Sequence, residues 1–312
     1  MADKTTVLVI GSINMDLVVR SPHMPSPGET VLGQEFFTSP GGKGANQAVA
    51  AARLGAKVKM IARVGEDAFG QMLRGNLEKE NIDCSCIRVT EGAASGVAMI
   101  VIDSRGENSI VVASGANFRV TPDDVFSEED AFAAAAVVVL QLELPLPTVR
   151  AAIEQARRHE CKIVLDPAPA PRAMPVELFR VDVISPNVSE AEILLDAKPT
   201  AERVDKQVAA DLLNRGAKAV VLKLGRRGAL VAAAADGQFH RVGPYRVPVV
   251  DTTGAGDAFT AAMAVAIARG EKLCDAVKFG NAAGALACTK IGAQQAMPTR
   301  DEVMLLMADQ PL

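Results

Sequence analysis

The residues with the clearest chemistry form a glycine-rich turn, Asp251-Thr252-Thr253-Gly254-Ala255-Gly256-Asp257, ahead of an alanine-rich stretch that is typical of a helix. A turn at a helix N-terminus directs several backbone N–H groups at one point, and the helix dipole favours an anion there. Gly254 and Gly256 permit positive φ angles and close approach of a phosphate. The turn therefore predicts a phosphate site with the Asp257 carboxylate at its edge. A carboxylate at this position can also serve only as a helix cap.

A second glycine turn, Pro40-Gly41-Gly42-Lys43-Gly44-Ala45-Asn46-Gln47, also precedes a helical segment. Its glycines let backbone amides approach a ligand, and Lys43 and Asn46 add donors. It is not a P-loop, because Gly44 follows Lys43 where Ser or Thr is required. The alternative is a tight loop in which Asn46 faces solvent.

Asn14 and Asp16 follow the first apolar run of the chain. Alternate residues of an extended segment share a face, so the two side chains converge. An amide beside a carboxylate can hold adjacent hydroxyl groups of a sugar. A surface strand would show the same spacing.

Two further segments lie where strands end. Asn187-Val188-Ser189-Glu190 follows an apolar run and has the spacing of a capping box, and Leu224-Gly225-Arg226-Arg227-Gly228 is a glycine-bounded turn. Each of the five segments lies at the carboxyl end of an expected strand or at the start of an expected helix. Ligands of open α/β sheets bind at that edge, so the coincidence favours one shared site.

The elements that would position these segments alternate along the chain. Short apolar runs typical of buried strands cover residues 7–10, 58–61, 137–140, 163–165, 181–184 and 220–222. Segments with helical periodicity cover residues 45–54, 69–80, 146–158 and 205–215. The alternation predicts an α/β fold with a mostly parallel sheet, helices on its faces and right-handed crossovers.

Two regions break this alternation. Residues 13–40 contain extended segments around a proline-rich turn, and residues 96–113 have the pattern of a hairpin. We expect them to form a small four-stranded sheet, which needs a partner surface because its own core is small. The expected division is a core of residues 1–12, 41–95 and 114–312 and a discontinuous lid of residues 13–40 and 96–113 that covers a site or forms a homodimer contact.

Composition excludes several classes of protein. The chain has 312 residues, 49% of them apolar and 22% charged, with a net charge of −4, so it can bury a large core. The net charge and the absence of a basic run disfavour a nucleic-acid partner. No apolar stretch is long enough for a membrane span, and the first residues do not have the pattern of a signal peptide. Five scattered cysteines are typical of reduced cytoplasmic thiols, and the presence of only three histidines disfavours a histidine triad or a zinc hydrolase.

At this point the sequence resembles the PfkB family of carbohydrate kinases over essentially its whole length. The resemblance is carried by Gly11–Asp16, Gly41–Ala48, Gln141-Leu142-Glu143, Asn187 with Glu190, and Asp251–Asp257. It implies a three-layer α/β/α core with a mostly parallel sheet and a small β-sheet lid. Within the family, the Gly41–Ala48 run together with Asn14 and Asp16 resembles the members that phosphorylate ribose.

The resemblance implies ATP-dependent phosphorylation of D-ribose at O5 to give D-ribose 5-phosphate and ADP. Asp257 would be the base, and Gly254, Ala255 and Gly256 would complete the anion hole. The implied sugar contacts are Asn14, Asp16, Gly41, Gly42, Lys43, Gly44, Asn46, Glu143 and Asp257. The implied nucleotide residues are Asn187, Glu190, Lys223, Gly225, Arg226, Gly228, Gly256 and Asn281.

The resemblance also implies two metal ions. Mg²⁺ would accompany ATP, with Glu190 acting on it indirectly. An activating K⁺ would be held mainly by main-chain oxygens, at the positions Asp251, Thr253, Ala287, Lys290, Gly292 and Ala296. Two positions depart from the family pattern. Ala296 stands where a hydroxyl side chain is frequent, and Lys223 stands where a small or hydroxylic residue is usual. The Lys223 ammonium either reaches a phosphate or extends to solvent, and extension to solvent is the favoured reading.

Three alternatives remain at this stage. The chain could be a kinase of the same family for deoxyribose, fructose or adenosine. It could be a nucleotide-binding oxidoreductase, although Gly11-Ser12-Ile13-Asn14 lacks the later glycines of the dinucleotide motif. It could also be a sugar sensor without catalytic activity, which the retention of Asp257 and both glycine turns disfavours.

Overall fold

The computed structural model describes residues 6–196, 205–235 and 237–312. Within this part of the chain, nine strands form one large sheet. Neighbouring strands are parallel except at the pairs β11/β12 and β12/β13. In spatial order they are β13 (Phe239–Val242), β12 (Ala229–Ala233), β11 (Ala219–Lys223), β10 (Val183–Ile184), β9 (Lys162–Leu165), β8 (Ala135–Leu140), β1 (Thr6–Ile10), β4 (Lys57–Gly65) and β5 (Ile87–Thr90).

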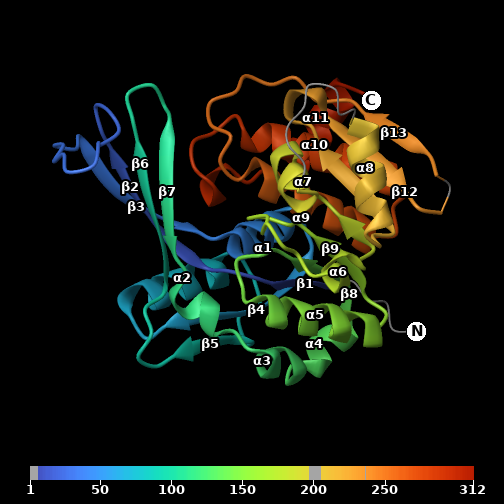
Figure 1. The fold of residues 1–312 in the computed structure, drawn as a ribbon, viewed down its shortest axis with the longest axis horizontal. Helices are drawn as coiled ribbons and strands as arrows, with labels where there is room; N and C mark the ends of the chain where they lie inside the picture. Colours follow the sequence, from blue (N-terminus) through green and yellow to red (C-terminus); the bar gives the residue numbers. More distant parts are fainter. Residues whose placement is uncertain (1–5, 197–204, 236) are drawn as a thin grey trace.

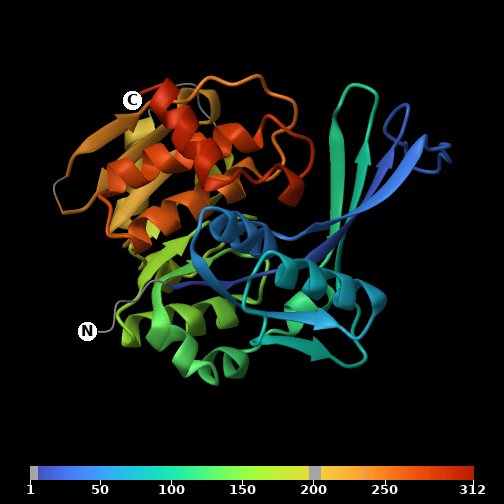
Figure 2. The ribbon, with the colours of Figure 1, turned by 180° about the vertical axis from the view of Figure 1, so that it is seen from behind.

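Helices cover both faces of this sheet (Figures 1 and 2). One face packs against α1 (Lys43–Arg53), α2 (Ala68–Lys79), α9 (Ala255–Ala268), α10 (Leu273–Ala287) and α11 (Arg300–Asp309). The other packs against α3 (Pro122–Phe126), α4 (Glu129–Ala134), α5 (Leu146–Arg158), α6 (Val176–Phe179), α7 (Val188–Leu194) and α8 (Asp205–Asn214). Short 3₁₀ turns are η1 (Gly115–Arg119), η2 (Gly225–Arg227) and η3 (Gln294–Ala296).

The central strands explain the two cores. Along β1, Val7 and Val9 join the first cluster of buried side chains, and Leu8 and Ile10 join the second. Successive strand residues point to opposite faces, so a run that is apolar throughout must be covered on both sides. The continuous apolar runs of the sequence thus lead to three layers, as expected.

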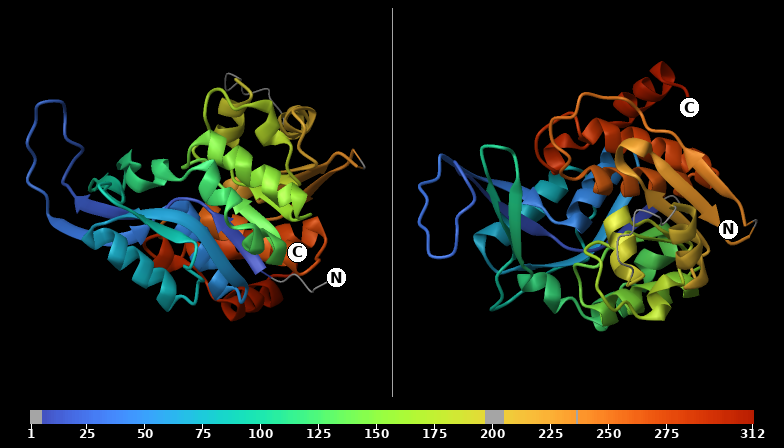
Figure 3. Two further views of the ribbon diagram at one scale, coloured as in Figure 1. Left: turned by 90° about the horizontal axis from the view of Figure 1, so that it is seen from below. Right: turned by 45° about the horizontal axis from the view of Figure 1, so that its top comes forward.

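A second, four-stranded sheet has the order β3-β2-β6-β7 and projects from one side of the core (Figures 1 and 3). Its strands are β2 (Asn14–Arg20), β3 (Glu35–Gly41), β6 (Gly96–Ile102) and β7 (Asn108–Ala113). β2 pairs with β3 in the antiparallel sense and with β6 in the parallel sense. The two sequence excursions therefore combine into one sheet, as the β-rich pattern predicted. The blue segment between β2 and β3 extends farthest from the core in Figure 3.

Some elements differ from the expectation. β12 and β13 add an antiparallel edge to the large sheet, and β5 adds a short strand at its other edge. β13 and β5 are the two edge strands, and neither has the continuous apolar run that identified the central strands, because an edge strand needs less covered surface. β12 is apolar and largely buried, but its alanine-rich sequence was not identified as a strand. The described part of the chain contains no helix that is both long and apolar enough to cross a bilayer.

Two glycines set the close approach of α1 to the end of β1. A Cβ atom on Gly44 would lie 2.6 Å from the carbonyl carbon of Gly11 and 2.6 Å from the nitrogen of Ser12. The N–H of Ala45 donates to the carbonyl of Ser12 at 2.9 Å. Direct backbone packing here places the first turn of α1 at the carboxyl edge of the sheet.

We predict that Gly44→Ala destabilises the protein by about 2 kcal/mol or more, because the new methyl group meets backbone that no side-chain rotation can clear. Gly75→Ala in α2 is the matched control, since a Cβ atom there meets nothing within 4 Å. Because alanine favours a helix interior, this control is expected to stabilise by about 0.5–1 kcal/mol. Urea unfolding of both variants measures the difference, and equal effects would contradict the packing argument.

Candidate active site

The Asp257 carboxylate is the centre of the site. Asp257 lies in the first turn of α9 and is only 5% exposed. Gly254, in the left-handed conformation with φ 73°, is the N-cap, and no side chain caps this helix. Asp257 is therefore not the cap that its position also allowed. The Ala255 N–H donates to the Thr252 carbonyl at 3.3 Å, so the N–H groups of Gly256 and Asp257 remain for a ligand. Burial raises the pKa of Asp257, while the Lys43 ammonium and two amide donors oppose that rise.

Those two donors come from α1. Asn46 Nδ2 donates to Asp257 Oδ2 at 2.9 Å, and Gln47 Nε2 donates to Asp257 Oδ1 at 3.0 Å. Both amides are buried, so Asn46 does not face solvent. The buried Oδ1 of Asn46 accepts no hydrogen bond from the described residues. A ligand hydroxyl next to Asp257 is the kind of donor that would satisfy it.

Gln47 extends the network across the sheet. Its Nε2 also donates to Asp166 Oδ2 at 3.0 Å, and its Oε1 accepts from Gln141 Nε2 at 2.6 Å. Asp166 directly follows β9 and is 1% exposed. The other oxygen of Asp166 accepts from Lys223 Nζ at 2.8 Å. A continuous chain of hydrogen bonds thus links Lys223 to Asp257.

The favoured expectation for Lys223 was wrong. Its side chain is 12% exposed and is paired with a buried carboxylate, rather than extended into solvent. Lys223 ends β11, and its side chain reaches toward the end of β9, with β10 between those strands. A buried carboxylate within reach holds the ammonium inside, because an unpaired charge there would cost several kcal/mol.

The small sheet supplies a second group of polar side chains. Asn14 and Asp16 lie two residues apart on β2, as their spacing predicted. The Oδ1 of Asn14 accepts from Asn117 Nδ2 at 2.7 Å, which orients its amide so that the NH₂ group is the remaining donor. A Cβ atom on Gly41 would lie 2.3 Å from Asp16 Oδ2. The Asp16 carboxylate therefore occupies the space that a side chain at position 41 would fill.

Glu143 binds the chain just before β2, at Ser12, and just after β3, at Lys43. Glu143 Oε2 accepts from the Ser12 hydroxyl at 2.5 Å and from the backbone N–H of Lys43 at 3.2 Å. Burial alone would lower the pKa of Lys43, but the Asp257, Asp166, Glu143 and Glu190 carboxylates together raise it above its usual range. Lys43 therefore stays protonated at neutral pH and offsets part of the negative charge.

Asp16 has a strongly shifted pKa. Burial, reinforced by the Glu143 and Asp257 carboxylates, raises it to about 7. Both causes act against the ionised form, since a carboxylate loses its hydration and meets like charges. The Asp16 side chain thus changes its charge near neutral pH.

The nucleotide-side residues expected from the resemblance lie around β10, β11 and α7. Asn187 Oδ1 accepts from the Glu190 N–H at 2.8 Å, and Glu190 Oε2 accepts from the Asn187 N–H at 2.7 Å, so the capping box is present. Burial raises the pKa of Glu190; the Lys223 charge lowers it and the Asp166 charge raises it. The capping reading is thus correct, and it also places Glu190 beside the Lys223–Asp166 pair.

The glycine-bounded turn after β11 forms η2. Gly225 and Gly228 have φ angles of 57° and 79°, which favour glycine, and Arg226 between them is exposed. Asn281 of α10 donates to the carbonyl of Gly243 at 2.8 Å, so its amide holds the segment that follows β13.

The segments expected to hold a monovalent cation meet at the C-terminal end of α10. Val250 N–H donates to the carbonyl of Cys288 at 2.8 Å. Asp251 Oδ2 accepts from the Gly292 N–H at 2.9 Å, and Asp251 Oδ1 accepts from Thr253. Despite partial burial, these hydrogen bonds keep the pKa of Asp251 low. Ala287 ends α10, Ala296 is buried in η3, and Lys290 pairs with Glu302.

Three site residues were missed by the sequence reading. Asp166 had the same signal as the residues that were found, because it directly follows a buried apolar run. Gln47 lies in the second glycine turn, but no pattern of the sequence indicates its partner. Asn117 lies in η1 after the hairpin, and no pattern of the sequence distinguishes it.

Comparison with known proteins agrees with this geometry. Residues 4–300 match the pfkB family of carbohydrate kinases. The ribokinase of Bacillus subtilis is 39% identical over 97% of this chain and 99% of its own, and that of Haemophilus influenzae is 38% identical over 96% and 98%. The structure of Arabidopsis thaliana ribokinase complexed with ribose and ATP superimposes with a TM-score of 0.89 at 31% identity, covering 97% of this chain and 98% of that one.

We predict that Asp16→Asn stabilises the unliganded protein at pH 8 by up to about 4 kcal/mol. The folded state binds the Asp16 proton more tightly than the unfolded chain does, so the protonated group stabilises below about pH 4 and that contribution is lost as pH rises through about 7. The gain from Asp16→Asn should therefore shrink steadily as pH falls. Urea unfolding across this pH range measures it.

Asp67→Asn provides a control of opposite sign. Despite desolvation, hydrogen bonds from Ser95 and Gly70 lower the pKa of Asp67. Its ionised form therefore stabilises the fold above the unfolded pKa, and that contribution is lost as pH falls through the folded value. Asp67→Asn should destabilise at pH 8 and lose its effect in acid. A gain from Asp16→Asn that is the same at every pH would contradict the charge argument.

Proposed function

We propose, because the chain belongs to the pfkB family of carbohydrate kinases, that it transfers the γ-phosphoryl group of ATP to O5 of D-ribose, giving D-ribose 5-phosphate and ADP. The chain is a sugar kinase by family. The observation that carries the choice of reaction is the place of the buried Asp257 carboxylate, in the first turn of an uncapped helix and coupled to the charges of Asp16 and Lys43. The relatives named above as ribokinases support ribose as the sugar.

Sugar binding follows from the polar groups of the lid and α1. We assign the contacts with the sugar hydroxyls to Asn14, Asp16, Glu143, Lys43 and Asn46, together with the backbone of Gly41, Gly42 and Gly44. Carboxylates and amides at fixed positions can each hold one or two hydroxyl groups. Their fixed spacing would orient O5 toward Asp257.

Asp257 acts as the base. Its carboxylate accepts the proton of the O5 hydroxyl as the oxygen attacks the γ-phosphorus in line with the departing ADP oxygen. Asn46 and Gln47 hold both carboxylate oxygens, so the base enters the reaction already oriented. The N–H groups in the Gly254–Asp257 turn would stabilise the charge on the transferring oxygens.

The nucleotide side would hold ATP with its Mg²⁺. The described residues contain no cluster of three His, Cys, Asp or Glu side chains that could hold a metal. Mg²⁺ is usually bound by few carboxylates together with substrate phosphates, and Glu190 beside the site fits such an indirect role. When bound, Mg²⁺ neutralises phosphate charge. The other proposed nucleotide contacts are Asn187, Gly225, Arg226, Gly228 and Asn281.

The small sheet is proposed as a lid that excludes water, so that ATP is not hydrolysed. This division of the chain, with residues 13–40 and 96–113 as the lid, stays a prediction. Its outer strand β7 is exposed throughout, with Val111 66% exposed and Met99 of β6 60% exposed. These side chains support the proposal of a homodimer through the lid. Cys84, Cys86 and Cys288 are free thiols, which suits the proposed cytoplasmic location.

A coupled assay of ADP release across D-ribose, 2-deoxyribose, fructose and adenosine tests the proposed reaction. We expect the highest kcat/KM for D-ribose. The kcat/KM for 2-deoxyribose should be lower than that for D-ribose by at least about 10-fold, because the missing hydroxyl leaves a polar group of the site unpaired. A higher kcat/KM for any other acceptor would overturn the choice of ribose.

Asp257→Asn is the companion variant in the same assay. It keeps the size of the side chain and removes the base, so turnover should fall about 10²- to 10⁴-fold. Binding of ATP, measured by calorimetry without sugar, should survive. Near-normal turnover of this variant would remove Asp257 as the base.

We further propose that K⁺ activates the enzyme through carbonyl oxygens of Asp251, Thr253, Ala287, Lys290, Gly292 and Ala296. The fit is supported by the hydrogen bonds that bring the turn before α9 against residues 288 and 292. The last carbonyl groups of a helix lack intrahelical partners, which makes the end of α10 suited to a cation.

The rate in K⁺ should exceed the rate in Na⁺ at equal ionic strength. Ala296→Ser adds a hydroxyl oxygen near the proposed ligands, so it should lower the K⁺ concentration needed for half-activation. Ala152→Ser in α5, a buried Ala on the opposite face of the sheet, should leave that concentration unchanged. Equal rates in the two salts would refute the cation proposal.

A further inference from the structure

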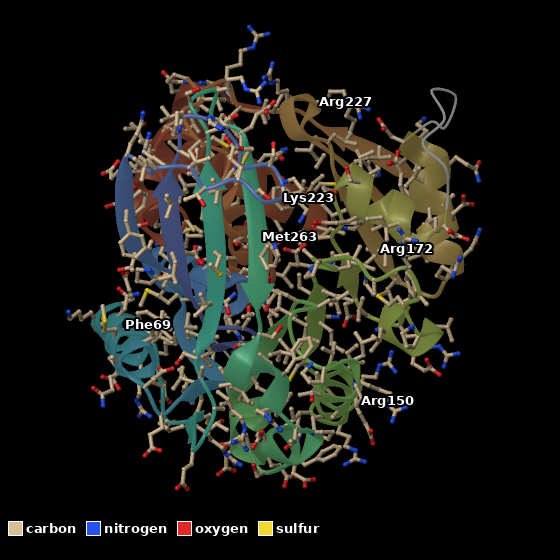
Figure 4. All side chains as sticks on the ribbon, turned by 60° about the vertical axis from the view of Figure 1, so that its left-hand side comes forward. Phe69, Arg150, Arg172, Lys223, Arg227 and Met263 are labelled. Carbon is tan, nitrogen blue, oxygen red and sulfur yellow. The ribbon has the colours of Figure 1, made fainter. Side chains whose placement is uncertain are left out.

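The Lys223 ammonium lies beside the place where an anionic ligand of the proposed site would bind. A Cβ atom built on Gly256 would be 3.6 Å from Lys223 Nζ, so the ammonium is next to the first turn of α9. The backbone of Lys223 is fixed from its other side, because its N–H donates to the carbonyl of Pro186 at 2.8 Å. Figure 4 views this part of the molecule with the small sheet in front and Lys223 labelled.

The position is electrostatically unfavourable without a ligand. The N-terminus of a helix carries partial positive charge, which repels a cation. The Asp166 carboxylate, 2.8 Å away, offsets this in the unliganded protein. The Lys223–Asp166 ion pair contributes little to the stability of the fold, because the cost of desolvating two charges cancels most of their attraction. A phosphate next to Gly256 would be attracted by both the ammonium and the helix.

We propose that Lys223 contacts the β- and γ-phosphates of the bound nucleoside triphosphate, and that Asp166 is the positioning residue that holds its ammonium at the end of α9. This inference rests on the proposed function only in taking the ligand to be a nucleoside triphosphate. It holds whichever sugar is the acceptor.

The same network gives Asp166 a second contact. Gln47 donates to Asp166 and to Asp257 through one amide nitrogen, with both distances 3.0 Å. A shift of Asp166 therefore moves a donor of the base as well as the phosphate-binding ammonium. The phosphate contact and the base are thus positioned by one set of side chains.

Calorimetry with ATP, ADP and AMP in the absence of sugar tests the inference. Lys223→Met should weaken ATP binding about 10- to 100-fold, the size of one charge-assisted hydrogen bond. ADP binding should weaken less, and AMP binding should change less than twofold. Asp166→Asn, which keeps the lysine but loosens its hold, should give a smaller loss with the same order among the nucleotides.

Lys218→Met is the matched control. Lys218 precedes the other end of β11 and also pairs with an aspartate, since its Nζ lies 3.0 Å from Asp182 Oδ1. This variant removes the same charge and an ion pair of comparable length, on a side chain that is 76% exposed and far from the proposed phosphates. All three nucleotides should therefore bind to it as to the wild type. If Lys223→Met fails to fold with Asp166 left unpaired, the double variant with Asp166→Asn removes that charge and should still discriminate against ATP.

The outcomes separate the two proposals. Unchanged ATP affinity in Lys223→Met, or equal weakening of ATP and AMP, overturns the phosphate contact and leaves a structural ion pair only. ATP binding by the wild type without phosphorylation of ribose would instead refute the acceptor and leave the role of Lys223 supported by its own binding data.

Discussion

Burial of the Asp257 carboxylate is the constraint on which the site depends. A carboxylate that is 5% exposed must have donors on both oxygens, and here they come from consecutive residues of α1. Those residues reach Asp257 only because α1 starts directly against the backbone after β1, at Gly44. One glycine contact in the core thus determines where the base is held.

The same burial sets the charge balance of the site. Four acidic side chains interact electrostatically with Lys43 or Lys223 in the unliganded protein: Glu143, Asp166, Glu190 and Asp257. A fifth, Asp16, interacts with the Glu143 and Asp257 carboxylates. Burial is the main cause that raises the pKa values of Asp16, Glu190 and Asp257, and neighbouring carboxylates raise them further. The two lysines and the uncapped end of α9 are what allow an anionic substrate to enter such a region, since the net charge of the chain is itself negative.

The small sheet depends on glycine for a different reason. Gly41 and Gly96 both pair with Asn14 of β2, from its two sides. A Cβ atom on Gly41 would lie 2.3 Å from the Asp16 side chain, and one on Gly96 would lie 2.2 Å from the Asn14 side chain. The polar side chains occupy the volume that side chains of the adjacent strands would fill. A sheet with little core of its own thereby presents fixed carboxylate and amide groups toward the large sheet.

The sequence by itself determined the layers and most of the ligand edge. Continuous apolar runs specify strands covered on both faces, and polar residues directly after such runs lie at one edge of a parallel sheet, which is why Asn187, Glu190 and the Gly254–Asp257 turn could be found from local pattern. Only the tertiary structure decided which side chains meet across that edge. Asp166, Gln47 and Lys223 lie far apart in the chain, and the order of strands β9, β10 and β11 brings them together. Lys223 shows the reason. Its local sequence allows an exposed ammonium, and it is buried because a carboxylate from another strand compensates its charge, which no local pattern encodes.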